Sequence, residues 1–207
     1  MDSSKIRYLF CLVIILLISC DTGYQQENNK WVWISYNEAV GKSVSEIDEH
    51  DFESFKVLEN ENYAKDLNSV FYTGSKILFA DPNTFEIIRN GYSRDKNRVY
   101  LDNELVVLAD PKTFKLLEFP YSKDDSNIFC GTIPLKLSKN EVDNFIVTNS
   151  NGNISSMKTS MTLSYFIDKN QDYKWLDTMK INGVIVGEWA TGKSLTKNFD
   201  GFKEIKN

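Results

Sequence analysis

The middle of the chain contains a 29-residue sequence that is repeated head to tail. YAKDLNSVFYTGSKILFADPNTFEIIRNG (63–91) aligns without a gap with YSRDKNRVYLDNELVVLADPKTFKLLEFP (92–120), and nine positions are identical. A third copy begins at Tyr121, and HDFESFKVLENENY (50–63) contains the end of an earlier copy. Because so short a unit cannot bury a hydrophobic face alone, neighbouring copies must stack, and the sequence predicts an array.

Each copy contains short strands separated by turn residues. The Asp-x-Asn motif at 66–68 is typical of a turn in which the Asp side chain accepts the backbone N–H two residues on. Aromatic and β-branched runs favour strands, and Thr73-Gly74 predicts a hairpin between two of them. Asp81-Pro82 predicts one helical turn, with Asp as N-cap and Pro at the first helical position. The predicted fold is therefore mainly β: tandem β-hairpin repeats of about three strands with short helical turns, plus a β-rich C-terminal region.

The pattern Y-x-x-DKN-x-V-Y…ADP-x-TF, best seen from Tyr92 to Leu117, resembles the DKNYY repeat family of bacterial, often lipid-anchored, proteins. The resemblance covers about residues 51–129. It implies tandem β-rich repeats and an envelope location, and it implies neither an established activity nor catalytic residues. The third copy departs from the family pattern after Ile133, because it lacks the DP-x-TF segment.

The N-terminus has the arrangement of a secretory signal. Lys5 and Arg7 precede an apolar run of 11 residues that ends at Ser19. This run is too short to cross a hydrocarbon core about 30 Å thick, for which a helix needs about 20 residues. A basic head, a short apolar stretch and a small residue predict a signal peptide over residues 1–19.

The segment Leu17-Ile18-Ser19-Cys20 resembles the lipobox of bacterial lipoproteins. In that motif the Cys is linked to diacylglycerol and becomes the first mature residue, and several acyl chains anchor a protein more firmly than one myristoyl chain. We therefore expect lipid attachment at Cys20. The expected location is the bacterial cell envelope, extracytoplasmic, on the periplasmic face or the cell surface.

Composition divides the rest of the chain and excludes one class of partner. Polar residues predict a flexible tether over 20–30, followed by the repeat region over 31–137 and a β-rich cap or subdomain over 138–207. The net charge of −5 argues against nucleic acid, because no basic stripe is available to neutralise phosphates. Cys130 is the one thiol expected to stay free after processing and acylation, and we expect it to pack as a small apolar side chain.

The C-terminal region has different signals. Ser138 begins an S-x-x-E capping box and predicts a short helix. Residues 149–156 are typical of a loop, and alternating apolar residues over 161–167 predict a strand. Asn182-Gly183 predicts a hairpin between short apolar strands.

The sequence GEWATGKS matches the phosphate-binding pattern G-x-x-x-x-G-K-[ST] through Gly187, Gly192, Lys193 and Ser194. A functional loop of this kind follows a parallel strand and opens a helix. Here the predicted hairpin makes the preceding strand antiparallel, and the 13 residues after Ser194 supply no later strand with a Mg²⁺ ligand. We interpret the match as a chance one and expect no nucleotide site.

A second motif is a weak candidate for calcium. Asp168, Asn170 and Asp172 have the spacing of the first three ligands of an EF-hand loop. Tyr173 stands where that loop needs Gly, and Met179 stands where it needs a bidentate Glu. An ordinary turn is favoured, and we expect no metal and no cofactor.

These observations favour a non-catalytic binding or scaffold lipoprotein, held to the membrane by its N-terminal lipid. The extended face of an array suits a protein or glycan partner. The alternative is an envelope hydrolase, whose carboxylates would come from Asp168, Asp172, Asp177 or Glu188. A purely structural role, or an antitoxin-like role, is not separated from the first hypothesis by the sequence.

Overall fold

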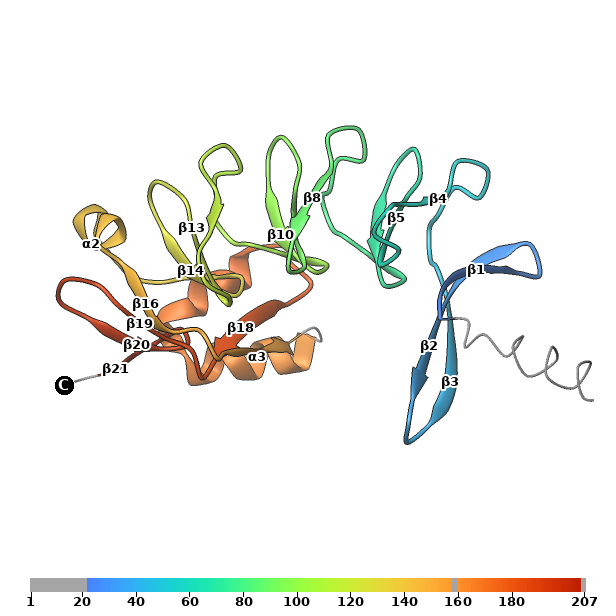
Figure 1. The fold of residues 1–207 in the computed structure, drawn as a ribbon. Helices are drawn as coiled ribbons and strands as arrows, with labels where there is room; N and C mark the ends of the chain where they lie inside the picture. The colour runs from blue at the N-terminus through green and yellow to red at the C-terminus, as the bar shows by residue number, and fades with distance from the viewer. Residues whose placement is uncertain (1–21, 158–159, 206–207) are drawn as a thin grey trace, which may run out of the picture.

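A computed structural model of the protein describes residues 22–157 and 160–205. The predicted signal peptide over 1–19 and the lipid-attachment residue Cys20 lie outside these residues. The described chain is mainly β, as predicted, and its small antiparallel sheets follow one another in a row (Figure 1).

Three four-stranded sheets correspond to the copies found in the sequence, and we call them the first, second and third repeat sheets. The first contains β4 (Lys56–Val57), β5 (Tyr63–Lys65), β6 (Val70–Tyr72) and β7 (Ser75–Lys76). The second contains β8 (Glu86–Arg89), β9 (Tyr92–Arg94), β10 (Val99–Leu101) and β11 (Glu104–Leu105). The third contains β12 (Lys115–Leu116), β13 (Tyr121–Lys123), β14 (Ile128–Cys130) and β15 (Ile133–Pro134).

The turns of the repeats form as predicted. Asp66 Oδ1 accepts the N–H of Asn68 at 2.7 Å, and the Thr73-Gly74 hairpin turn has φ angles of 45° and 81°. The segment after Asp81 makes a single turn of backbone. The prediction of three strands per unit is too low, because the residues that begin each copy with Tyr also pair as a strand.

The first tyrosine of each repeat connects it to the next unit. The hydroxyl of Tyr63 donates to the carbonyl of Gly91 at 3.0 Å, and that of Tyr92 donates to the carbonyl of Pro120 at 3.4 Å. Both tyrosines are 1% exposed. The two side chains therefore have equivalent surroundings one repeat apart, as stacked copies of one unit require.

A three-stranded N-terminal sheet precedes the repeats. It contains β1 (Gly23–Glu27), β2 (Lys30–Asn37) and β3 (Gly41–Glu46). The expectation of a flexible tether over 20–30 is therefore wrong for its described part, since β1 pairs with β2 along its whole length. The polar sequence of β1 concealed the strand, which pairs along its length with β2 and packs its one large side chain, Tyr24, against a core cluster.

The N-terminal sheet follows the geometry of the repeats. The Tyr24 hydroxyl donates to the carbonyl of Asn62 at 3.4 Å, and Asn62 precedes Tyr63 as Gly91 precedes Tyr92. Tyr24 pairs with the residue nine positions later, which is also the register of Tyr63. This sheet is therefore an additional unit of the array, which the sequence comparison missed.

The last unit of the array is also concealed in the sequence. The C-terminal sheet contains β16 (Ile146–Asn149), β19 (Thr191–Lys193), β20 (Asn198–Asp200) and β21 (Lys203–Ile205), in the strand order of a repeat sheet.

Two hydrogen bonds confirm this correspondence. Gly201 donates its N–H to the carbonyl of Ala190 at 2.7 Å, the equivalent of the 2.8 Å bond from Asp102 to Gly91. The Tyr121 hydroxyl donates to the carbonyl of Ala190 at 3.3 Å, as the Tyr92 hydroxyl donates to that of Pro120. The repeats therefore extend beyond the predicted boundary at 137/138.

A helical insertion interrupts this last unit between β16 and β19. It contains β17 (Asn153–Met157), α3 (Ser160–Lys169), the 3₁₀ helix η1 (Gln171–Thr178) and β18 (Val184–Glu188). The short helix α2 (Lys139–Asp143) precedes β16 and has the predicted capping box at Ser138. None of the described helices has the length and hydrophobicity needed to cross a membrane.

Three predictions for the insertion are wrong. The predicted strand over 161–167 is helix α3, because Leu163, Phe166 and Ile167 have helical spacing and pack into one core cluster. The loop predicted over 149–156 contains most of β17. Asn182-Gly183 forms no hairpin, because the strand that follows it, β18, pairs with β17. The two strands are antiparallel, so the predicted direction of β18 is right although its predicted partner is wrong.

The insertion lies along one side of the row, beside the second and third repeat sheets (Figure 1). The carbonyl of Ile185 in β18 accepts the N–H of Thr132 at 2.8 Å, and Gly131 forms a bridge with Val186. Ile185 is fully buried with Val99 and Phe129 of the repeats. The insertion and the repeats therefore share a continuous core.

We expect Asp95→Ala to destabilise the array strongly, because its buried carboxylate accepts backbone N–H groups from two loops. Leaving these donors without acceptors should lower the free energy of unfolding by about 3 kcal/mol or more. Urea unfolding followed by circular dichroism would measure the loss. The control Asp125→Ala changes an exposed side chain of the next repeat, and a loss of the same size there would contradict this role.

Candidate functional site

Three buried aspartates of the array are structural. Asp66, Asp95 and Asp124 occupy the same position in successive repeats and are 5%, 3% and 1% exposed. A buried carboxylate needs hydrogen-bond donors to remain ionised at low cost. The donors for each buried aspartate must come from the fold itself or from a ligand.

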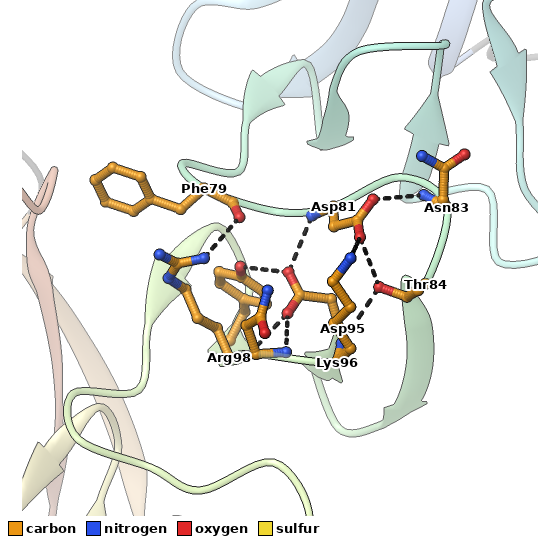
Figure 2. Close-up of polar contacts among 9 residues, drawn as sticks. Phe79, Asp81, Asn83, Thr84, Asp95, Lys96 and Arg98 are labelled. Atoms are coloured by element: carbon orange, nitrogen blue, oxygen red, sulfur yellow. Dashed lines mark hydrogen bonds and ion pairs between the residues drawn. The ribbon is translucent and has the colours of Figure 1, made fainter.

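Figure 2 shows the donors around Asp95. Its Oδ1 accepts the N–H groups of Asn97 at 2.7 Å and Arg98 at 2.8 Å. Its Oδ2 accepts the N–H of Asp81 at 2.9 Å and the hydroxyl of Tyr100 at 2.9 Å. Four donors occupy the four lone-pair positions of a carboxylate, so this side chain has no capacity left for a substrate or a metal.

The exposed side of the same network is also paired. Lys96 Nζ lies 3.0 Å from Asp81 Oδ2, and Thr84 donates its hydroxyl to the same oxygen at 3.1 Å. The bond from Lys96, together with that from the Asn83 N–H, lowers the pKa of Asp81 to about 2. A groove of about 540 Å³ lies beside this network, but its Arg94 guanidinium is already paired with Glu86. The polar side chains named at this groove are therefore already paired within the fold.

Cys130 is not a reactive thiol in this fold. Its side chain is completely buried, and its sulfur lies against Gly187. Burial raises the pKa of the Cys130 thiol to about 12. Because the thiolate is the nucleophilic form, the side chain acts as an apolar packing group, as predicted.

The glycines and the lysine of the phosphate-binding pattern lie in strands of two separate antiparallel sheets. Gly187 belongs to β18, and Gly192 and Lys193 belong to β19, which is followed by a turn and another strand rather than by a helix. A methyl group at Gly192 would lie 2.3 Å from the ring of Phe145, and one at Gly187 would lie 2.4 Å from Cys130 Sγ. Close packing therefore accounts for both glycines.

The hydroxyl of the same pattern has a structural partner. Ser194 Oγ donates to Glu141 Oε1 at 3.2 Å, and Thr196 Oγ1 donates to the same oxygen at 2.6 Å. Ser194 follows β19 where Asp66 follows β5, so the carboxylate of this last unit comes from helix α2 instead. The bond from Thr196, with those from Ser138, lowers the pKa of Glu141 to about 2.

The four carboxylates proposed for a hydrolase are not gathered in one pocket. Asp168, Asp172 and Asp177 are exposed, and Glu188 is partly buried at the end of β18. Asp172 forms an ion pair of 2.9 Å with Lys136. Nothing in this arrangement places two carboxylates on either side of a reacting bond.

The calcium candidates do not form an EF-hand loop. Asp168 lies in the last turn of α3, Asn170 follows that helix, and Asp172 lies in the first turn of η1. Within residues 22–157 and 160–205, no group of three or more His, Cys, Asp or Glu side chains is placed to hold a metal.

The surroundings of Asp172 favour an anion instead. A pocket of about 450 Å³ opens between the insertion and the C-terminal sheet, and we call it the lysine pocket. Its lining includes three lysines and three aromatic side chains: Lys136, Lys169, Lys203, Tyr173, Phe199 and Phe202.

Among the residues that the structure describes, two of these lysines have no acidic partner. Lys169 Nζ lies 5.5 Å from the ring centre of Tyr165, and Lys203 Nζ lies 5.6 Å from that of Phe202. Neither ammonium forms an ion pair with a carboxylate in the part of the chain that the structure describes. Sequence reasoning missed this pocket, because its lysines come from three separate elements and form no motif.

A family model described as the DKNYY family matches the chain twice, over residues 5–104 and 92–206. The chain belongs to the DKNYY family. The second match continues through β19, β20 and β21, in agreement with a last repeat at the C-terminus of this DKNYY protein. No curated protein and no solved structure matches the chain.

The carboxylate that Glu141 supplies predicts a dependence of stability on pH. The folded pKa of about 2 lies below the usual 4.5, so Glu141 stabilises the fold above pH 4.5 and loses this effect as the pH falls towards 2. Glu141→Gln should therefore lower the urea midpoint at pH 6 and have little effect near pH 2. The exposed Glu53→Gln is the control, and a constant effect of Glu141→Gln across this range would contradict the assignment.

Proposed function

We propose that this DKNYY protein is a lipid-anchored, non-catalytic binding module of the bacterial cell envelope. In this proposal Cys20 carries the lipid, and the lysine pocket binds an anionic group on a glycan or protein partner. The supporting observation is the pair of ammonium groups, at Lys169 and Lys203, that lie beside aromatic rings and have no carboxylate partner within residues 22–157 and 160–205.

Physical chemistry favours an anionic ligand at this place. Lys136 is paired with Asp172, and Glu204, which also lines the pocket, is paired with Lys197. Lys169 and Lys203 are the lining lysines without an ion pair among the described residues. The buried ring of Phe202 forms part of the wall and lowers the local exposure to water. An ammonium next to an apolar surface attracts a carboxylate or sulfate more strongly than one fully surrounded by water.

The remaining chemistry of the chain supports binding rather than catalysis. Burial raises the pKa of the Cys130 thiol, so this side chain is not available as a nucleophile. Burial also raises the pKa of the Tyr63 and Tyr92 hydroxyls above their usual range. The buried carboxylate of Asp95 already accepts four donors from the fold. These groups stabilise the array and are not poised for proton transfer.

We expect Lys169→Ala/Lys203→Ala to weaken the binding of acidic ligands about tenfold or more, because both free charges of the pocket are removed. Calorimetric titration with a galacturonate tetramer and with a tetra-aspartate peptide would measure this and separate glycan from protein recognition. The matched control is Lys112→Ala/Lys115→Ala, which removes two exposed lysines elsewhere on the array.

Three outcomes would count against the proposal. They are a wild-type protein that binds neither probe, an equal loss in both double variants, and release of shortened galacturonate products. The last outcome would favour a hydrolase.

A further inference from the structure

The hairpin of the N-terminal sheet is much longer than its equivalents in the repeats. In the first repeat sheet only Thr73 and Gly74 separate the two strands β6 and β7. In the N-terminal sheet, β2 and β3 continue as a two-stranded ribbon to a turn at 38–40 and project from the row of sheets (Figure 1). The stacking of units does not need this extension, since the shorter hairpins stack without it.

The ribbon exposes apolar side chains near its tip. Tyr36 is 49% exposed, Val40 is 77% exposed and Val44 is 46% exposed. Val44 lies opposite Ile34, which is fully buried, and Tyr36 is two residues further along the same strand and so lies on the same face. On this face Tyr36 and Val44 therefore continue the buried apolar side chain of Ile34 towards the exposed end, with Lys42 opposite Tyr36.

The array begins beside this ribbon. Gly23, the first residue of β1, pairs with Ile34, so β1 starts at the end of the sheet that is nearer to the tip. Cys20 is three residues earlier in the sequence, and three residues span at most about 10 Å. The tip lies about five residues beyond Ile34, which corresponds to about 17 Å along a strand.

We infer that the tip of the β2–β3 ribbon is a second membrane contact, and that the lipid bilayer covers Tyr36, Val40 and Val44 when Cys20 is acylated. Acyl chains at Cys20 hold the bilayer surface within reach of the tip. Tyrosine is enriched at the membrane–water interface, where its ring has an apolar and a polar side. Two contacts fix the orientation of the array on the membrane, which a single lipid does not. This inference rests on the lipid attachment proposed above.

The test uses the full acylated chain in vesicles of phosphatidylethanolamine and phosphatidylglycerol. Val40→Cys is labelled with the polarity-sensitive fluorophore NBD, since buried Cys130 does not react and acylated Cys20 has no free thiol. The matched control is Leu67→Cys, which is 71% exposed on a turn of the first repeat sheet. We expect spin-labelled lipids to quench the label at position 40 about twofold or more, and to leave the label at position 67 unaffected.

The mass of the N-terminal peptide separates the two ways in which this can fail. If Cys20 carries no acyl group, the lipid anchoring of the proposed function is wrong. If Cys20 is acylated and position 40 is quenched no more than position 67, the membrane contact of the ribbon is wrong and the anchoring stands. Equal urea midpoints for both labelled variants and the unlabelled chain would show that the labels leave the fold intact.

Discussion

In each of the three repeat sheets of this protein, a buried aspartate accepts backbone N–H groups from two loops that lie 14 or 15 residues apart in the sequence. One loop is the Asp-x-Asn turn of its own sheet, and the other is the turn that leaves the preceding sheet. An ionised carboxylate is costly to bury without donors, so each copy provides part of what its neighbour needs to fold. The tyrosine hydroxyls add a second connection in the same direction, from each unit to the next.

The last unit keeps this chemistry although its sequence has changed. Ser194 replaces the aspartate, and Glu141 from helix α2 supplies a carboxylate that accepts the hydroxyls of Ser194 and Thr196. With Ser194 at the position of the aspartate, the sequence Gly192-Lys193-Ser194 matches the end of a phosphate-binding loop. The resemblance to that loop therefore arises because a serine occupies the aspartate position of this repeat. The insertion that contains α3 is attached to the array at the same end.

The central repeats could be predicted because their turn chemistry is local: Asp66 and Asn68 determine a turn by themselves. The terminal units could not, because Tyr24 bonds to a backbone carbonyl that any residue supplies, and the partner of Glu141 lies 53 residues away. Alternation and helical spacing were both compatible with the segment 161–167, and tertiary packing selected the helix. The lysine pocket was not predictable because three elements distant in sequence meet there.

The central claim is that interchangeable units hold one another in place, and deletion of one complete repeat tests it most directly. Removing residues 63–91 joins Asn62 to Tyr92 and leaves every later unit with an intact neighbour in register. The account predicts a single cooperative urea transition and β-type circular dichroism for this chain, whereas deletion of residues 63–84, which breaks the register, should abolish that transition. Loss of folding in the in-register deletion, or equal stability of the two deletions, would contradict it.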